Sequence, residues 1–438
     1  MQYKTRIHGT AEVTDMIAGA GGPDRRLSED DVRGLMAAAF DAVKLDGRRV
    51  LVIIPDHTRT APVPMLFRLL VEQLGSRAGK LDFLIALGTH PIMTEAHINE
   101  HLGITADERA GRYGHFGVFN HRWDVPEQLT QPGTISAAEM KEISEGRLEI
   151  DVPVIVNKMA YEYDRLIICG PVFPHEVVGF SGGNKYLFPG IAASNVINTS
   201  HWLGALMTNP RVNGAKDTPV RRVINKAASF VTTDKLCIAF VVTGGELAGM
   251  YIDTPEQAWS AAADLSDKVH IVYKDRAYHT VLSCSPKMYD DIWTAGKCMY
   301  KLEPVVADGG ELIIYAPHVT EVSYSHGKVL DEIGYHVRDY FVNRWDEFKD
   351  YPWGVVAHST HVRGIGTCDN GTEHPRVTVT LATGIPQERC ERIGLAYRDP
   401  ASINPDDYAN REDEGVLLVP KAGEMLYRLE DPPAWQTM

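Results

Sequence analysis

The stretch RVLVIIPDHTRTAP, residues 49–62, joins a strand to a polar loop and sets the pattern for the rest of the chain. Every position between the ends of Arg49–Pro55 is aliphatic, which is typical of a strand buried on both faces of a parallel sheet. The loop DHTRTAP follows, and a helix is expected around Pro64–Leu74. A strand, a loop and a helix in this order form the repeating unit of an α/β sheet.

The same alternation continues along the chain. Thr94–Leu102 is predicted to be a helix, with Thr94 as its N-cap and Gly103 at its end. A second long helix is expected over Thr254–Asp267. Further strands in this half are expected at Leu81–Leu87, Asp164–Cys169 and Lys235–Val242. Beyond residue 270 the pattern restarts, with strands expected at His279–Cys284, Glu311–Tyr315, Trp353–Ala357 and Arg376–Leu381.

The length of 438 residues exceeds the usual size of one domain, so we expect two. The expected fold is α/β, with two domains that each have a central, largely parallel sheet flanked by helices. The active site is expected in the cleft between them. We place an N-terminal cofactor-binding domain at residues 1–270 and a C-terminal, substrate-side domain at 271–414. The segment 415–438, with its strand-like run Gly415–Pro420, is expected to return to the first domain.

Composition excludes several classes of protein. The formal net charge of −14 and the absence of a basic stripe argue against nucleic-acid binding. The six cysteines are scattered without a C-x-x-C pair, so neither a zinc ribbon nor a disulfide framework is expected. No run reaches the ~18 apolar residues of a membrane helix. The N-terminal MQYKTRIHGTAEV lacks an apolar signal segment, so we expect a cytoplasmic protein that does not bind membranes.

Polar side chains gather in the loops after three predicted strands. These are the loop Asp56–Arg59, His90, and the long loop that contains His175–Lys185. In open α/β sheets, ligands bind beyond the carboxyl ends of the strands. The sequence therefore predicts one shared site built from these loops.

The densest segment is PHEVVGFSGGNKYLFPGIAASNVINTS, residues 174–200, followed by His201. Gly182 and Gly183 offer backbone N–H groups to an anion, but the spacing is not that of a Walker A loop. The histidines at 175 and 201 suit metal ligation, acid/base chemistry or a structural role. Because H-E-x-x-H is absent, a conventional zinc hydrolase has little support.

The other two loops have similar alternatives. His90 suits a general base that takes a hydroxyl proton, or a residue that caps the following turn. Arg59 suits a carboxylate or phosphate ligand, oriented by Asp56, or one half of a structural ion pair. Lys297, taken alone, would be a surface lysine.

Taken together, five segments resemble the nickel-dependent lactate racemase family. They are VIIPDHTRTAPVP, LIALGTHPIMTE, VNKMAYEYDRLIICG, HEVVGFSGGNKYLFPGIA with His201 downstream, and IWTAGKCM, in the family's order over roughly residues 50–300. The resemblance implies a racemase or epimerase that inverts C2 of a 2-hydroxy acid. The cofactor it implies is a covalently attached nickel-pincer nucleotide, pyridinium-3,5-bisthiocarboxylic acid mononucleotide, with nickel held between two sulfur atoms and a ring carbon.

Carried over position by position, the resemblance assigns a role to each matching residue. Lys185 would bond the cofactor covalently, and His201 would be the protein ligand of nickel. His90 and His175 would be the acid/base pair on opposite faces of the stereocentre. Further contacts to the cofactor are expected from Asp56, Thr58, Ser181, Gly182 and Gly183. Substrate contacts are expected from Arg59, Lys297 and Thr294.

Two positions depart from the family pattern. Asn184 stands where arginine is common, and Thr294 stands where lactate enzymes tend to have glutamine. The shorter Thr294 side chain would leave room for a 2-hydroxy acid larger than lactate. The expected partners are this small molecule and, transiently, the enzymes that make the cofactor.

Two other functions are considered beside the racemase. One is a hydrolase or lyase with a metal held by histidines, and the other is a carrier of the nickel nucleotide without turnover. The run His358–Arg363, with His361 inside it, is expected to follow a strand of the second domain, and its role is left open.

Overall fold

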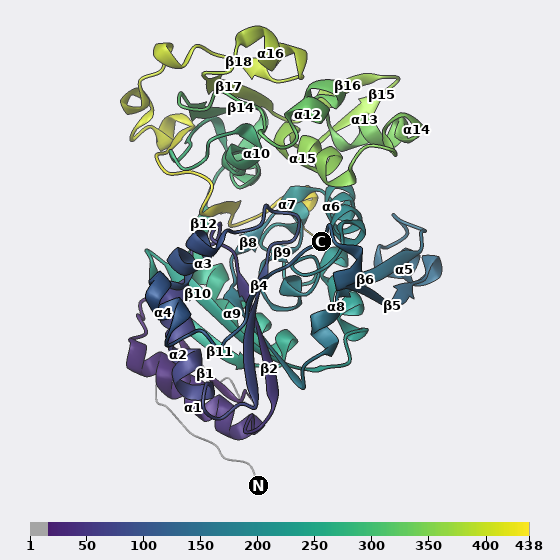
Figure 1. Cartoon of the computed structure of the whole chain (residues 1–438). Helices are drawn as coiled ribbons and strands as arrows, with labels where there is room; N and C mark the ends of the chain where they lie inside the picture. The colour runs from purple at the N-terminus through teal and green to yellow at the C-terminus, as the bar shows by residue number, and fades with distance from the viewer. Residues whose placement is uncertain (1–15, 438) are drawn as a thin grey trace.

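Two separate sheets organise the chain, one in each of the bodies that lie above one another in Figure 1. This computed structural model describes residues 16–437, so the N-terminal segment considered above for a signal sequence lies outside it. Within the described residues, no helix has both the length and the apolar run needed to cross a membrane.

The first sheet has seven strands in the order β1-β11-β10-β7-β2-β3-β4. The five from β10 to β4 are parallel, whereas β11 runs antiparallel to both of its neighbours, β1 and β10. The strands are β1 (Ala18–Gly21), β2 (Arg49–Pro55), β3 (Lys80–Ala86), β4 (Val118–Asn120), β7 (Arg165–Pro171), β10 (Asp234–Thr243) and β11 (Glu246–Asp253).

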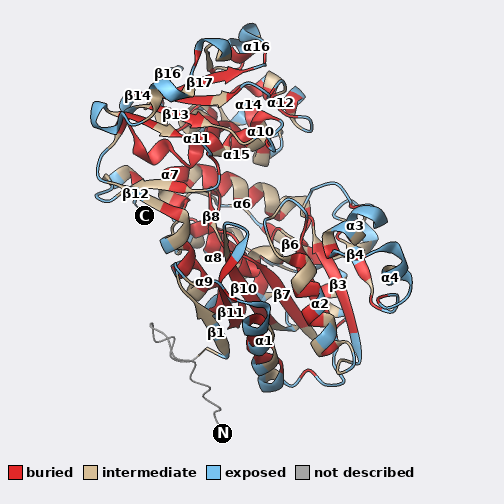
Figure 2. Cartoon of the chain, turned by 90° about the vertical axis from the view of Figure 1, so that its left-hand side faces the viewer, coloured by how far each residue is buried: buried red, intermediate tan, exposed pale blue. Residues whose placement is uncertain are grey.

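Helices cover both faces of this sheet because its strands are apolar on both sides. Val50, Val52 and Ile54 of β2 pack in the core that contains α1 and α2. Leu51 and Ile53 face the opposite core, with α6, α8 and α9. The helices of this body are α1 (Glu29–Val43), α2 (Val63–Leu74), α3 (Glu95–Leu102), α4 (Ala106–Ala110), α5 (Ala137–Ile143), α6 (Ser194–Met207), α7 (Asn209–Val212), α8 (Pro219–Ser229) and α9 (Pro255–His270). Figure 2 shows the buried strands between exposed helix surfaces.

The second sheet has five strands, all parallel, in the order β18-β17-β14-β13-β19. Its strands are β13 (Tyr278–Cys284), β14 (Val306–Ala316), β17 (Thr378–Thr383), β18 (Ala396–Tyr397) and β19 (Val416–Val419). The helices around it are α10 (Ile292–Ala295), α11 (Lys297–Tyr300), α12 (Gly327–Ile333), α13 (Arg338–Asn343), α14 (Trp345–Phe348), α15 (Trp353–Arg363) and α16 (Gln387–Arg392).

Four two-stranded pairs complete the fold. They are β5 (Leu129–Ile135) with β6 (Val152–Asn157), β8 (Pro174–His175) with β9 (Gly179–Phe180), β12 (Ile271–Lys274) with β20 (Leu426–Leu429), and β15 (Gly366–Asp369) with β16 (Thr372–Pro375). The β12–β20 pair joins the chain just after α9 to its C-terminal segment.

The expected α/β fold class is confirmed, and most predicted elements are present. The strand Arg49–Pro55 has the predicted bounds, and α2, β3, β7 and β10 lie within a few residues of theirs. The Thr94 side chain caps α3 by accepting from the His97 N–H, and Gly103 ends this helix in the left-handed conformation. The sequence therefore predicted both the N-cap and the C-terminal end of this helix correctly.

The prediction of a strand at Trp353–Ala357 is wrong, because these residues begin helix α15. Every residue from Val355 to Val362 is buried, so the apolar run reflects a helix enclosed on most sides rather than a buried strand. Short apolar runs do not distinguish the two cases. His358, His361 and Arg363 consequently lie on a helix and not in a loop after a strand.

The run Gly415–Pro420, expected to return to the first domain, lies in the second sheet instead. Val416–Val419 forms β19, which pairs with β13 at the edge of the second sheet. Leu426–Leu429 then pairs with β12. Domain bounds near residue 270 stay a prediction.

Both sheets have a point where the strand order reverses. In the first sheet the chain runs outward from β2 to β3 and β4, and later strands are added on the other side of β2, beginning with β7. In the second sheet the chain runs from β13 to β18 and returns to add β19 beside β13. Crevices at such reversals are the usual ligand sites of open α/β sheets.

Candidate functional site

The loop after β7 forms a short hairpin, β8–β9, and then a tight turn that ends at Lys185. Gly182 and Gly183 both have positive φ, +82° and +58°. A Cβ at Gly182 would lie 2.6 Å from Val172 Cγ2, and one at Gly183 would lie 2.9 Å from Trp259 Cβ. These two positions require glycine because of both backbone conformation and space.

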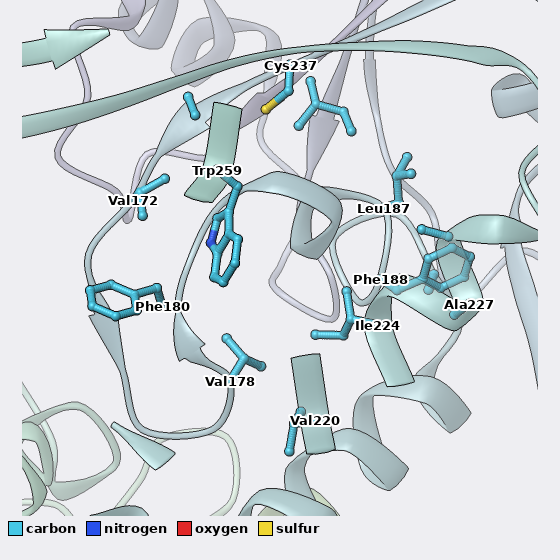
Figure 3. Packing of buried hydrophobic residues seen from close by; sticks show 14 of the residues in the cluster. Val172, Val178, Phe180, Leu187, Phe188, Val220, Ile224, Ala227, Cys237 and Trp259 are labelled. Atoms are coloured by element: carbon cyan, nitrogen blue, oxygen red, sulfur yellow. The ribbon is translucent and has the colours of Figure 1, made fainter. Parts of the chain in front are cut away.

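Two buried side chains, Arg221 and Trp259, stabilise this turn. Arg221 of α8 donates hydrogen bonds to the carbonyl oxygens of Phe180 and Gly182, and its guanidinium stacks on Trp259 at 4.1 Å. The Trp259 Nε1–H donates to the Ser181 carbonyl oxygen at 2.8 Å. Figure 3 shows Trp259 beside Phe180 and Val178 in this core. The turn is thus fixed by both hydrogen bonds and packing.

Two more side chains of the turn face inward. The Ser181 hydroxyl donates to the Pro171 carbonyl oxygen and accepts from the Phe173 N–H, each at 3.0 Å. Asn184 donates to Glu256 Oε1 at 2.6 Å. Both therefore stabilise the turn, and the cofactor contact expected of Ser181 stays a prediction.

Lys185 lies part-buried at the end of the turn. Burial lowers the pKa of its amine to about 7, and the positive charge of Arg59 acts in the same direction. About half of the amine is therefore uncharged near neutral pH, which makes it a competent nucleophile. This is the property a lysine needs to form a covalent bond with a ligand.

His201 projects from α6 beside this amine. Its Nδ1–H donates to the Ile197 carbonyl oxygen at 2.7 Å, because a carbonyl oxygen only accepts. The lone pair of Nε2 is then free. Burial, followed by the charge of Lys185, lowers the pKa of His201, so the ring is neutral at pH 7. A neutral histidine fixed in this way has the usual geometry of a metal ligand.

His175 has the opposite arrangement. The Val177 N–H donates to its Nδ1 at 3.1 Å, so the neutral ring carries its proton on Nε2. The side chain is buried, and burial lowers the pKa of the imidazole well below its usual value. The charges of Lys185 and Arg59 act in the same direction. As described, His175 Nε2 is a proton donor.

His90 is held by a carboxylate. Its Nδ1–H donates to Asp56 at 2.5 Å, and the Thr58 hydroxyl donates to the other oxygen of Asp56 at 2.6 Å. Burial alone would raise the pKa of Asp56, but the hydrogen bond and charge of His90 and the charge of Arg59 hold it well below its usual range. His90 Nε2 is thereby left as a proton acceptor.

The second domain contributes cations to the same place. Lys297, at the start of α11, has its pKa lowered by burial and by the charge of Arg59. One helical turn later, Lys301 is buried, and burial lowers the pKa of its amine to about 8. Glu176 of the first domain lies near these two lysines. Burial alone would raise the pKa of its carboxyl, but a hydrogen bond from its own backbone N–H and the charges of His361, Lys297 and Lys301 lower it.

The structure thus brings most of the predicted residues together. Asp56, Arg59, Lys185, His175 and His201 meet at the strand-order reversal of the first sheet, and Lys297 reaches them from the second domain. Thr294 lies one turn before Lys297, and its N–H donates to Asp291 Oδ1. Within residues 16–437 no hydrogen bond or ion pair of Thr294 reaches the first domain.

Two residues of the cluster, Glu176 and Lys301, were missed in the sequence, and the role of a third, His361, was left open. Glu176 directly follows His175, and Lys301 lies four residues after Lys297, so each had a spacing signal beside a predicted residue. His361 is 4 % exposed, its Nε2 has no hydrogen-bond partner, and it is close enough to Glu176 and His201 for their charges to act on it.

A metal site made by protein ligands alone is not present in the described part of the chain. Within residues 16–437, no three His, Cys, Asp or Glu side chains come together as metal ligands do. His201 would therefore need a ligand from a bound molecule to hold a metal ion.

Comparison with known proteins gives a family match. Residues 34–213 match the model of the lactate racemase N-terminal domain. The chain is 28 % identical over 233 residues to the lactate racemase of Thermoanaerobacterium thermosaccharolyticum, which covers 51 % of this chain and 46 % of that protein. It is 30 % identical over 164 residues to the lactate racemase of Lactiplantibacillus plantarum, covering 37 % and 34 %. The matches span about half or less of these curated relatives.

Solved structures extend the likeness over the whole chain. A Thermotoga maritima protein superposes with a TM-score of 0.81 at 33 % identity, covering 94 % of this chain and 100 % of that one. The apoprotein of lactate racemase from T. thermosaccharolyticum superposes with a TM-score of 0.71 at 18 % identity, covering 92 % and 93 %. At this identity the second likeness supports the fold alone.

Proposed function

Because this chain belongs to the lactate racemase family, we propose that it is a racemase or epimerase of a 2-hydroxy acid. We propose further that it works with a nickel-pincer nucleotide bonded to Lys185, for which His201 is the protein ligand of nickel. The observation that carries this proposal is that the Lys185 amine, about half uncharged near neutral pH, lies close enough to His201 for its charge to act on that ring, whose Nε2 is free.

The residues present fit this cofactor. Lys185 supplies a nucleophilic amine, and His201 supplies one neutral nitrogen to a metal whose other ligands come from the cofactor itself. Gly182 and Gly183 keep side chains away from the turn before Lys185, and Asp56, which accepts from the Thr58 hydroxyl, is close enough for its charge to act on the Lys185 amine. When bound, the cofactor would supply the hydride acceptor for the substrate α-carbon, and these residues would hold it in place.

Two cations are proposed to bind the substrate carboxylate, Arg59 from the first domain and Lys297 from the second. Arg59 offers a planar fork that binds a carboxylate through two hydrogen bonds, and Lys297 offers a second positive charge from the other domain. The two side chains are close enough for the charge of Arg59 to act on the Lys297 amine. Thr294 lies one turn from Lys297, and we propose that its short side chain admits a substrate larger than lactate.

Proton transfer falls to the two histidines. His90 Nε2 accepts the proton of the 2-hydroxyl group, with Asp56 stabilising the imidazolium that forms. After the hydride has moved, the substrate is a 2-keto acid that turns its other face. His175, once it carries a proton on both ring nitrogens, then donates the Nε2 proton to the regenerated oxygen. In the reverse direction the two histidines exchange these tasks.

Intact mass and chirality test the proposal together. The protein is produced beside the enzymes of cofactor synthesis, which we propose as its transient partners. We expect a nucleotide-sized adduct on the Lys185 peptide, one nickel per chain, and interconversion of the C2 isomers of at least one acid in a 2-hydroxy-acid panel. Lys185→Ala should lose both adduct and activity. Full nickel loading with no interconversion across the panel would overturn the proposal.

The two other functions give different outcomes. An unmodified Lys185 with zinc bound would favour the hydrolase or lyase, for which the described residues offer no three-ligand cluster. A complete adduct without exchange of the α-hydrogen would favour the carrier. The paired histidines with opposite free groups favour turnover over storage, because a carrier has no need of a proton acceptor and a proton donor.

A further inference from the structure

Glu176 is a part-buried carboxylate that the proposed reaction leaves without a task. It directly follows His175, and its Oε2 lies 3.4 Å from His175 Nδ1. Its side chain is 19 % exposed. A part-buried carboxylate this close to an imidazole is costly unless one acts on the other.

The hydrogen bonding of His175 defines what this carboxylate can do. In the neutral ring described above, Nδ1 accepts from the Val177 N–H, so it needs no other partner. When His175 gains a second proton, Nδ1 becomes a donor as well, and an N–H cannot accept from it. Among the contacts of Nδ1, the Glu176 carboxylate is the acceptor within reach.

We propose that Glu176 is the carboxylate partner of His175, a positioning residue that accepts from Nδ1–H whenever this histidine carries two protons. The inference rests on the acid/base role proposed for His175. It makes the site symmetric in chemistry: Asp56 supports His90 on one side, and Glu176 supports His175 on the other.

The proton count shows why the partner is needed in both directions. When His175 donates from Nε2, it must begin as imidazolium, because a neutral ring that gave up its proton would be left as imidazolate. When it accepts the hydroxyl proton, Nε2 must first be free, so the ring proton must sit on Nδ1. Each state has an Nδ1–H, and in each Glu176 receives the hydrogen bond while its charge offsets that of the ring.

Burial and the nearby positive charges all disfavour the protonated form of His175. Burial disfavours it, as do the positive charges of Lys185 on the turn, Arg59 after β2 and Lys301 after α11, and His201 on α6 when protonated. Among the charged groups that act on His175, Glu176 provides the nearby negative charge. Its removal should therefore leave His175 fixed in the neutral form.

The first test reads His175 directly and needs no turnover. Histidine labelled with ¹⁵N in the ring reports which nitrogen carries a proton, and His175→Gln assigns the signal. Over a pH series, Glu176→Gln should lower the pKa of His175 by about one unit or more, since a carboxylate within reach of an imidazole favours its charged form by that amount. Glu176→Asp keeps the charge but shortens the reach, and should lower it less.

Glu424→Gln is the matched control. Glu424 belongs to the same charge cluster through Lys301, but its side chain is 50 % exposed and pairs with Lys421 at 3.1 Å. Removing this charge should leave the ¹⁵N titration of His175 nearly unchanged. Equal titrations of His175 in Glu176→Gln and in the wild type would overturn the proposal, whether or not the protein proves to be a racemase.

The second test uses the cofactor-loaded protein. Glu176→Gln should lower kcat by about 10- to 100-fold with little change in KM, the usual cost of losing a residue that orients a site histidine. The ratio of kcat/KM in the two directions is fixed by the equilibrium constant, so both directions must slow together. A rise in KM at constant kcat would instead assign Glu176 to the substrate-binding cations and overturn its role as partner of His175.

Discussion

Two loops of the first domain reach the candidate site, and they are held in opposite ways. The loop His175–Lys185 is largely buried, and Arg221 and Trp259 donate to its carbonyl oxygens. The loop Asp56–Arg59 is open, with His57 and Thr58 exposed, and Asp56 is its main anchor. The difference suits two tasks: a rigid turn for a covalently bonded group and an open loop where substrate enters.

His90 and His175 differ as the two loops do, one being exposed and the other buried. The His90 side chain is 45 % exposed and donates from Nδ1 to a carboxylate. The His175 side chain is 10 % exposed, and its Nδ1 accepts from the backbone. One therefore starts as an acceptor at Nε2 and the other as a donor. A reaction that takes the hydroxyl proton of one isomer and returns a proton to the oxygen of the other needs one acceptor and one donor. His175 becomes the donor once its Nδ1 is also protonated.

Asp56→Asn should have the largest effect, because it acts on the open loop at its one strong anchor. The amide cannot hold His90 in the acceptor form or stabilise its imidazolium, and we expect kcat to fall by about 10³- to 10⁴-fold. KM should change far less. Steady-state rates of isomer interconversion by the cofactor-loaded protein measure both.

Asp124→Asn is the control for Asp56, since its carboxylate pairs with Arg122 on the surface. It should retain the wild-type rate. If Asp56→Asn kept most of its activity, the open loop would be a substrate entrance without a role in proton transfer.

Arg221→Leu tests the buried loop through stability. It leaves the carbonyl oxygens of Phe180 and Gly182 without their guanidinium donor, and buried unpaired acceptors are costly. We expect the free energy of unfolding to fall by ~2–4 kcal/mol. Urea unfolding followed by tryptophan fluorescence measures this change.

The neighbouring Arg222→Leu is the matched control. Its side chain is 44 % exposed and pairs with Asp217 on the surface, so it should cost ~1 kcal/mol or less. Equal losses in the two variants would mean that the turn before Lys185 does not depend on its buried support.

Much of the fold was readable because its strands are buried on both faces. The runs at β2, β3, β7 and β10 are continuous and aliphatic, and each is followed by a loop or helix signal. The prediction of a strand at Trp353–Ala357, the start of helix α15, was wrong because a helix buried on most sides has the same apolar composition as a buried strand. The predicted placement of β19 was wrong because the sheet that a strand joins depends on contacts with residues far away in the sequence.

The sequence predicted the site residues that stand together in one segment of the chain. The turn before Lys185 and the segment after β2 have motifs that mark them. Glu176 and Lys301 were missed although each stands near a predicted residue, and the role of His361 was left open, because their part in the site arises where the two domains meet. The same holds for Arg221, a residue whose role depends on lying under a turn 36 or more residues earlier in the chain.

The smallest expected effect concerns the amine at the end of the buried loop. In protein made without the cofactor, Lys185 should react with acetic anhydride at a rate that rises about tenfold from pH 6 to pH 8 and then levels off, since its pKa lies at about 7. Lys349 provides the contrast, because it is exposed and its ion pair with Asp346 raises its pKa. Its rate should rise about 100-fold over the same interval and keep rising, as for an ordinary amine. Mass spectrometry of the two labelled peptides measures both in one sample. If Lys185 followed Lys349 up to pH 9, its amine would be an ordinary one. Burial in the rigid loop would then contribute position and no chemical activation.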